Sequence, residues 1–287
     1  MNLVECVPNF SEGRNRVVVD GIAGAIAAAG AVVLDRTSDW DHNRFVVTFA
    51  GSPEAVEDAA FAAVAAAVDR IDLSRHSGVH PRTGAADVVP FVPVRGVTLE
   101  DCAAIAARVG ARIWERLRVP VYLYEAAARS PERVALEFIR REAGSIKPDF
   151  GHGAHPTAGA TIVGARKFLI AWNINLRTNR LEAARTIARK IRYSSGGLPC
   201  VKALGLPLAS RNQVQVSMNL TDFERTPLHV VYEAVSKAAD EEGIEIAGSE
   251  LIGLIPAKAL ELSEGHDLHW QNFRPDTILE NRLPDTM

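Results

Sequence analysis

The sequence predicts an α+β protein with two ferredoxin-like βαββαβ subdomains and a ligand cleft between them. The first observation is the order of the expected helices and strands, which repeats along the chain although the two halves share little sequence identity. The second is the alternation of apolar and polar residues in Phe168–Leu176 and Val214–Leu220, typical of strands with one buried face. The other face carries amides such as Asn173 and Asn175, which either meet water or line the cleft. We favour the cleft, because Asn is otherwise disfavoured in strands.

The first half is expected to read βαββαβ, followed by one more helix and one more strand. The expected strands are Leu3–Phe10, Ala31–Asp35, Phe45–Phe49, Val88–Val94 and Val119–Tyr124. Apolar residues at helical spacing predict helices over 18–29, 56–68 and 102–113, and a further helix is expected over 130–143. Ser52 and Thr98 are expected N-caps. Pro90 and Pro93 predict an edge strand, at least locally, because proline cannot donate to a central ladder.

The second half is expected to repeat βαββαβ. Its strands are predicted at Phe168–Leu176, Val201–Leu208, Val214–Leu220 and within Ile244–Ile255, with helices over 181–191 and 228–238. Thr226 followed by Pro227 repeats the start of the helix after Ser52, where a cap precedes proline. The expected subdomains are residues 1–147 and 161–287, and the link between them is 148–160, which is rich in Gly, Pro and His.

Composition limits the class of protein. The chain has 287 residues, is 47% hydrophobic and carries a net charge of −3, so nothing in its charge favours a nucleic acid or a membrane surface as partner. Cys6, Cys102 and Cys200 are far apart and form no CxxC pair, which is typical of a reducing compartment. No signal peptide is recognised, and the apolar stretches fall short of the ~18–20 residues that span a bilayer. We therefore expect a soluble cytoplasmic protein.

The strongest candidate for chemistry is His80. It lies in Ser74–Val94, where Gly78 and Pro81 prevent a regular helix and place the imidazole on a loop. An imidazole titrates near neutral pH and suits a general base, with Asp87 as a group that could orient it. The simpler interpretation is a loop histidine that caps nearby carbonyls.

Metal, phosphate and nucleophile sites are less favoured. His76 and His80, and likewise His152 and His155, lack the helix that would make them facing ligands, so no metal is expected. Gly151–Gly164 offers many backbone amides but no nucleotide-binding glycine motif, which favours a linker whose amides touch a ligand between the halves. The basic run 177–192 is most simply a solvated helix face, and no GxSxG motif is present.

Long motifs identify a resemblance. The matching segments are LVECVPNFSEGRN at Leu3–Asn15, SRHSGVHPRTGAADVVPFVPVRGVT at Ser74–Thr98, VPVYLYEAAA at Val119–Ala128, PDFG with HPTAGATIVGARKFLIAWNINL at Pro148–Leu176, QVSMNLTDFERTPLHVVYE at Gln215–Glu233 and GSELIGLIP at Gly248–Pro256. Together they cover nearly the whole chain, and they resemble the glutamate formiminotransferase family. The resemblance implies transfer of a formimino group from N-formimino-L-glutamate to N5 of tetrahydrofolate, the co-substrate, in histidine degradation. It also implies a homodimer and a folate tunnel between the two subdomains.

The resemblance also implies a set of site residues. The family's catalytic histidine falls on His80. The folate-contacting linker falls on Gly151, His152, Gly153, Ala154, His155, Pro156, Thr157, Ala158 and Gly159. Because both substrates carry carboxylates, arginines and lysines become expected anion ligands. The expected folate- or substrate-binding residues outside the linker are Asn9, Asp39, Asn43, Arg44, Arg82, Asn173, Asn175, Arg189 and Lys190.

Some features depart from the longer members of the family. Thr37 stands where the fused animal enzymes have an acidic residue, so the acid that supports His80 is expected to be Asp39 or Asp41. The chain ends at Met287 without a cyclodeaminase domain, and no deaminating activity is expected. Three alternatives stay open: a related transferase that uses another formimino or formyl donor, a folate-binding protein without catalysis, and a metal-dependent hydrolase.

Overall fold

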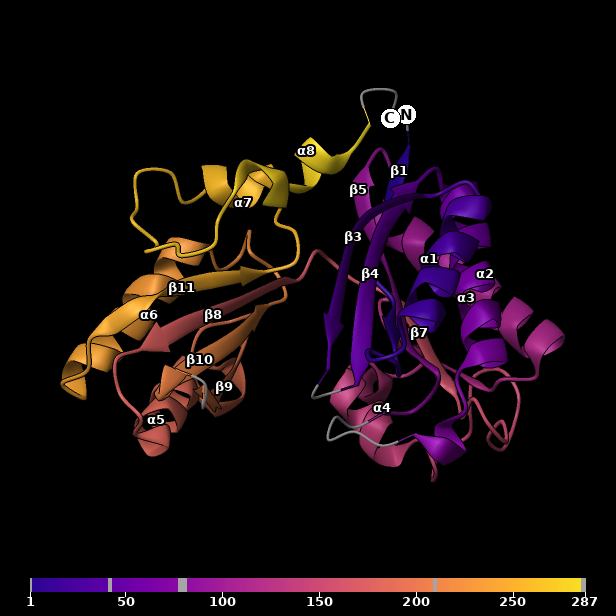
Figure 1. Cartoon of the computed structure of the whole chain (residues 1–287), viewed down its shortest axis with the longest axis horizontal. Coiled ribbons are helices and arrows are strands. Elements are labelled where there is room, and N and C mark those ends of the chain that lie inside the picture. The colour runs from indigo at the N-terminus through magenta and orange to yellow at the C-terminus, as the bar shows by residue number, and fades with distance from the viewer. Residues whose placement is uncertain (1, 41–42, 77–81, 209–210, 285–287) are drawn as a thin grey trace. The chain divides into compact units, whose positions relative to one another are not determined.

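The computed structural model describes residues 2–40, 43–76, 82–208 and 211–284 (Figure 1). The chain divides into two compact units, unit 1 over residues 1–166 and unit 2 over residues 167–284. Each unit has its own sheet and its own hydrophobic core. The α+β class and the two ferredoxin-like subdomains predicted from the sequence are confirmed.

The sheet of unit 1 has the strand order β3-β4-(β1, β2)-β5-β7-β6. Its strands are β1 (Leu3–Cys6), β2 (Asn9–Phe10), β3 (Val32–Asp39), β4 (Arg44–Gly51), β5 (Ala86–Arg95), β6 (Val121–Glu125) and β7 (Thr161–Ala165). Its helices are α1 (Arg16–Ala28), α2 (Pro53–Arg70), α3 (Leu99–Leu117) and α4 (Leu136–Glu142), with short 3-10 turns at Leu73–Arg75 and Pro131–Arg133. If β1 and β2 are counted as one interrupted strand, the first four strands have the order of a ferredoxin-like sheet. β7 and β6 then extend that sheet in parallel.

The sheet of unit 2 has the order β11-β8-β10-β9, with antiparallel neighbours throughout. Its core elements are β8 (Ile170–Leu176), α5 (Leu181–Ile191), β9 (Val201–Leu208), β10 (Gln213–Leu220), α6 (Leu228–Glu241) and β11 (Ile246–Ile252). They are followed by α7 (Ala257–Glu261), a 3-10 turn at Pro275–Thr277 and α8 (Leu279–Arg282), and a further 3-10 turn lies at Tyr193–Ser195. The predicted βαββαβ order of this half is confirmed.

The two faces of the unit 1 sheet are covered by different helices. Helices α1, α2 and α3 pack on one face, where Phe10 and Phe45 are fully buried and their rings stack 4.8 Å apart. Helix α4 packs on the other face, where Ile139 contacts a separate apolar cluster with Val88 and Tyr122. This second cluster joins α4, which lies between β6 and β7 in the sequence, to strands β5, β6 and β7.

Two of the three helix N-caps predicted from the sequence are confirmed. The expected caps Ser52 and Thr98 are confirmed, and Thr98 forms a reciprocal capping box with Asp101. The predicted cap at Thr226 is wrong. Its hydroxyl donates to the carbonyl of Pro199 at 2.6 Å, and α6 begins after Pro227.

Two expectations change with the sheet order. Residues 161–165, assigned from the sequence to the second subdomain, form β7 between β5 and β6, so the structural division falls after Arg166. The expected edge strand Val88–Val94 belongs to β5, which lies inside the sheet. Pro90 is tolerated because its backbone faces the break between β1 and β2, where its carbonyl accepts from Val7 at 3.2 Å. Pro93 lies beyond the last pairing of β5 with β7, at Phe91, so β5 is locally an edge there.

Candidate functional site

A polar cluster lies in unit 1 where β2, β4 and β5 meet. The guanidinium of Arg44, the first residue of β4, donates to the side-chain oxygen of Asn9 in β2. The side-chain oxygen of Asn43 accepts from the backbone of Gly13 at 2.9 Å. A small pocket opens here and is lined by Phe10, Ser11, Asn43, Arg44, Arg82 and Asp87. Three of the expected binding residues, Asn43, Arg44 and Arg82, are therefore brought together, with Asn9 in contact with Arg44.

Asp87 is the anionic centre of the cluster. Its carboxylate is almost fully buried and accepts from the backbone N–H of Thr83 at 2.7 Å and from Nη2 of Arg140 at 2.5 Å. The pairing of β2 with β5 shifts at this point, with Asn9 opposite Val88 and Phe10 opposite Ala86. Asp87 is thus the extra residue of a β-bulge, a device that redirects a side chain.

The electrostatics of the cluster favour an anionic ligand. Burial lowers the pKa of Arg44, the nearby Arg140 lowers it further, and Asp87 and Asp39 oppose that shift. Burial also lowers the pKa of Arg82, again opposed by Asp87. Three guanidinium groups are grouped around the buried carboxylate of Asp87, so the local balance is positive and favours an anionic ligand such as a carboxylate.

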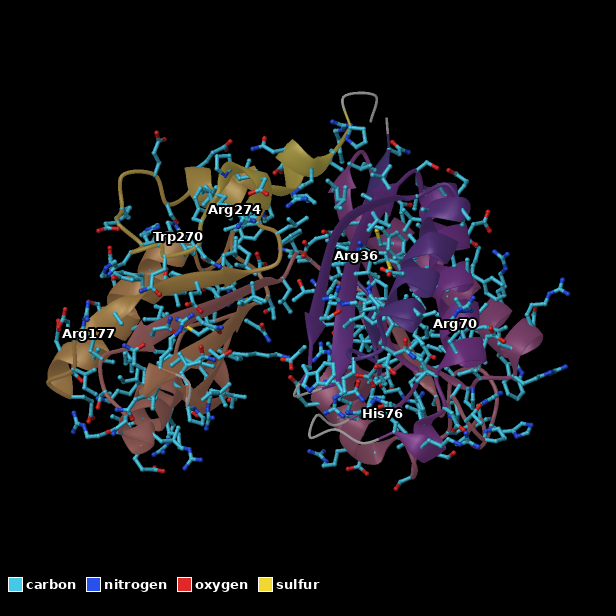
Figure 2. All side chains as sticks on the ribbon, in the orientation of Figure 1. Arg36, Arg70, His76, Arg177, Trp270 and Arg274 are labelled. Carbon is cyan, nitrogen blue, oxygen red and sulfur yellow. The ribbon has the colours of Figure 1, made fainter. Side chains whose placement is uncertain are left out.

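His76 and Arg82 flank residues 77–81 and contact each other. The guanidinium of Arg82 contacts the ring nitrogens of His76, and since arginine only donates, the imidazole accepts. Burial, followed by the charge of Arg82, lowers the pKa of His76 and favours the neutral ring. Figure 2 shows His76 at the end of unit 1 where α4 also lies. The expected catalytic residue His80 and the alternative acid Asp41 lie outside the described residues.

Part of the glycine-rich linker runs beside both flanks of that segment. Leu73 donates to the carbonyl of Thr157 at 2.8 Å, and Ala160 donates to the carbonyl of Thr83 at 3.0 Å. Gly84 must lack a side chain here, because a Cβ would come 2.0 Å from the carbonyl oxygen of Ala160. Residues 155–160 are therefore built into the site by backbone contacts.

The rest of the linker has a different environment. A Cβ on Gly151 would meet the ring of Trp114 on α3, and His152 packs edge-on against the same ring, 5.2 Å between centroids. Gly153 and Ala154 are exposed. Nδ1 of His155 accepts from the backbone of Ala158 at 3.1 Å, which makes this histidine a turn cap. The remaining linker residues are the exposed Pro156, the half-buried Thr157 and Gly159, and the buried Ala158.

The expected binding residues of unit 2 lie on two faces of its sheet. Asn173 and Asn175 alternate with Trp172 and Ile174, which face the core under α5 and α6. Asn175 is fully buried and its amide donates to the side chain of Gln271 at 3.3 Å. Arg189 and Lys190 are on the outer side of α5, and Lys190 pairs with Glu241 at 2.9 Å. Unit 2 therefore does not bring the four residues together.

Other chemistries find little support in the described residues. No group of three or more His, Cys, Asp or Glu is placed to hold a metal ion in residues 2–40, 43–76, 82–208 and 211–284. Burial raises the pKa of Cys102 to about 12 and that of Cys6 well above its usual range, which disfavours thiolate nucleophiles. In the same part of the chain, no helix is long and apolar enough to cross a bilayer.

Sequence reasoning missed Arg140 and the role of Thr83. Arg140 lies 53 positions from Asp87, and its neighbours Arg141 and Glu142 make the segment look like a solvated helix. Because the contact depends on the position of α4 beneath the sheet, no local pattern reveals it. The one available signal was Asp87 itself, a carboxylate at the start of an apolar strand.

Comparison with known proteins supplies the family. The formiminotransferase domain, N-terminal subdomain, matches residues 3–166, and the formiminotransferase domain matches residues 171–273. The chain is 44% identical to a glutamate formimidoyltransferase of Thermoplasma acidophilum, over 99% of this chain and 98% of that protein. It is 43% identical to the Streptococcus pyogenes glutamate formimidoyltransferase, over 98% of each. It is also 48% identical to the formimidoyltransferase-cyclodeaminase of Sus scrofa, over 90% of this chain but 51% of that longer protein. The chain therefore belongs to the formiminotransferase family.

Proposed function

We propose that this protein transfers the formimino group of N-formimino-L-glutamate to N5 of tetrahydrofolate in histidine degradation. The products are 5-formiminotetrahydrofolate and L-glutamate. The observation that carries the proposal is the similarity, over nearly the full length of both chains, to proteins named glutamate formimidoyltransferase.

The charge of the candidate site agrees with these substrates. Both carry carboxylates, and the cluster around Asp87 holds Arg44, Arg82 and Arg140 in partly buried positions. Arginine recognises carboxylates through paired, charge-assisted hydrogen bonds. We assign carboxylate binding to Arg44 and Arg82, and hydrogen bonding to the side chains of Asn9 and Asn43.

The reaction requires a proton to move between two nitrogens. N5 attacks the amidine carbon, a C–N bond forms, and the tetrahedral adduct then breaks its bond to the glutamate nitrogen. N5 must lose a proton and the departing nitrogen must gain one, so the step is balanced without an external acid or base. His80 is the residue we propose for this transfer, because a neutral imidazole can accept the first proton and return it.

Residues 151–159, Asp39, Asn173 and Asn175 are proposed to contact folate or substrate, and Arg189 with Lys190 to meet folate carboxylates. A homodimer without a bound metal is proposed from the resemblance to the family. The cytoplasm is the proposed compartment, because Cys6 and Cys102 are buried as free thiols.

The test is turnover by the purified full-length chain. Tetrahydrofolate and N-formimino-L-glutamate are mixed with the protein, and 5-formiminotetrahydrofolate is followed by its absorbance. We expect turnover with this donor that exceeds turnover with N-formyl-L-glutamate and with other formimino amino acids. Tight tetrahydrofolate binding with turnover only on another donor would overturn the assignment of the substrate, and no folate binding would overturn the proposal as a whole.

A further inference from the structure

We propose that Arg140 is a positioning residue for the reaction, and that it acts through Asp87 on the backbone of Thr83. The proposal rests on the function proposed above and deepens it at the same site. It assigns a role to α4, a helix outside the ferredoxin-like core of unit 1.

The chain of contacts begins with a buried ion pair. The Asp87 side chain is 4% exposed and the Arg140 side chain is 21% exposed, and their charged atoms are 2.5 Å apart. A carboxylate removed from water to this extent needs a cationic partner, and Arg140 supplies it. The other oxygen of Asp87 is then free to accept from Thr83, at 2.7 Å.

Thr83 is held from two sides. Its N–H donates to Asp87, and its carbonyl accepts from Ala160 at 3.0 Å. The residue before it, Arg82, contacts the imidazole of His76, so the backbone of Thr83 and the side chain of Arg82 are both held in place. These two residues follow directly after the segment 77–81 that includes His80 in the sequence. The contacts of Arg140 therefore reach the site through one carboxylate and one backbone amide.

Helix α4 is anchored well enough to serve as a fixed support. Ile139, the residue before Arg140, is fully buried among Val88, Tyr122 and Ile162. The hydroxyl of Tyr122 donates to the carbonyl of Ala143, just past the end of the helix. Loss of the Arg140 guanidinium would therefore release Asp87 while leaving α4 in place, because the packing of the helix does not depend on that group.

The same helix offers a matched control. Arg141 is the next residue, its side chain is 69% exposed, and it pairs with its neighbour Glu142 at 2.8 Å. Substitution of either arginine removes one positive charge from α4, but only Arg140 contacts Asp87. A long-range electrostatic role of α4 would affect both variants alike.

The experiment compares Arg140→Ala with Arg141→Ala in the full chain. The first readout is amide hydrogen exchange of peptides that contain Thr83, which needs no substrate. We expect exchange at Thr83 to speed up at least about 10-fold in Arg140→Ala, as for an amide that has lost its acceptor, and to match the wild type in Arg141→Ala. Equal exchange in the two variants would overturn the proposal, whether or not the protein has the proposed activity.

The second readout is turnover. We expect kcat/KM to fall about 10²-fold in Arg140→Ala, the size of effect that a misplacement of about 1 Å produces, and to stay within about twofold in Arg141→Ala. Added guanidinium ion should restore part of the lost rate in Arg140→Ala and none of it in His80→Asn. Faster exchange at Thr83 with an unchanged rate would overturn the positioning role.

A third variant covers the case in which Arg140→Ala does not fold. Arg140→Lys retains the charge on α4 but lacks the planar fork that arginine presents to a carboxylate. We expect faster Thr83 exchange and lower kcat/KM than in the wild type, with an unchanged thermal midpoint. Wild-type values of both exchange and rate in folded Arg140→Lys would overturn the proposal. The wild type could show no turnover of N-formimino-L-glutamate with tetrahydrofolate. That result would overturn the proposed function, and the exchange rate at Thr83 would still test the contact from Arg140 through Asp87.

Discussion

The two units share a ferredoxin-like core, but they protect the outer edge of its fourth strand in different ways. In unit 1 the fourth strand, β5, pairs with β7, and the sheet continues to β6. In unit 2 the fourth strand, β11, is flanked by the chain near Trp270, where Ser249 donates to the carbonyl of His269 at 2.7 Å. An uncovered strand edge is open to wrong pairing, so each unit needs some such cover.

The two covers bring different chemistry to the sheet. The extension of unit 1 carries α4 and places the cation of Arg140 on Asp87. The tail of unit 2 places the amide of Gln271 on Asn175, a neutral pair, and also on the carbonyl of Ala247 at 2.9 Å. The same core therefore becomes a charged site in one unit and a neutral polar contact in the other. The segments added outside the repeated core decide whether a charged site or a neutral contact forms.

The largest expected effect concerns unit 1 and is on catalysis. We expect His80→Asn to lower turnover by about 10²–10⁴-fold, because the amide cannot relay a proton. Tetrahydrofolate affinity should change by no more than a few-fold, as measured by binding titration. Wild-type turnover in this variant would remove the general-base role of His80.

The next effect concerns unit 2 and is on stability. Trp270 is labelled in Figure 2. The centroid of its ring lies 5.4 Å from that of the buried Trp172, so Trp270→Ala should lower the free energy of unfolding of unit 2 by about 2–4 kcal/mol. Hydrogen exchange in β8 and β11 should speed up, while exchange in β4 of unit 1 should not. The control is Trp40→Ala in unit 1, whose side chain is 66% exposed and should cost less than about 0.5 kcal/mol. Equal losses in the two variants would mean that the tail of unit 2 does not secure its core.

The pH dependence of stability tests whether His76 is neutral in the folded chain. The pKa of His76 is lowered from 6.5 in the folded chain, so the unfolded chain binds its proton first as the pH falls. Stability should therefore be lost as the pH drops below about 6.5 and should level off below the lowered folded pKa. We expect His76→Asn to lose less unfolding free energy between pH 7 and pH 5.5 than the wild type does in urea titrations. An identical pH dependence in the two proteins would show that His76 is not held neutral by burial and Arg82.

The smallest expected effect is on substrate binding by unit 2. Arg189→Ala combined with Lys190→Ala should raise the KM for tetrahydrofolate a few-fold, if these side chains meet folate carboxylates. The effect is small because Lys190 already pairs with Glu241, and exposed ion pairs contribute at most about 1 kcal/mol. Lys202→Ala, which removes an exposed lysine from β9, serves as the control. A KM equal to that of the wild type would make this face of α5 a solvated surface.

Local sequence patterns predict most of the helices and strands of both units and their order, but not β7, α7 or α8. The capping box of Thr98 and Asp101, the alternation in Phe168–Leu176 and the apolar spacing of the helices were read correctly because each depends on residues within about two helical turns. The two βαββαβ orders then followed, and with them the ferredoxin-like class.

Which strands are neighbours and which charges meet depends on contacts between residues that are far apart in the sequence. β7 joins the sheet of unit 1 although its sequence lies beyond the predicted link, because a parallel pairing needs no adjacent turn. The bulge at Asp87 and its pairing with Arg140 depend on chain closure over 53 positions, a distance at which no periodicity or cap carries information. Side chains that meet across such a distance are selected by packing, and packing exists only once the chain has folded.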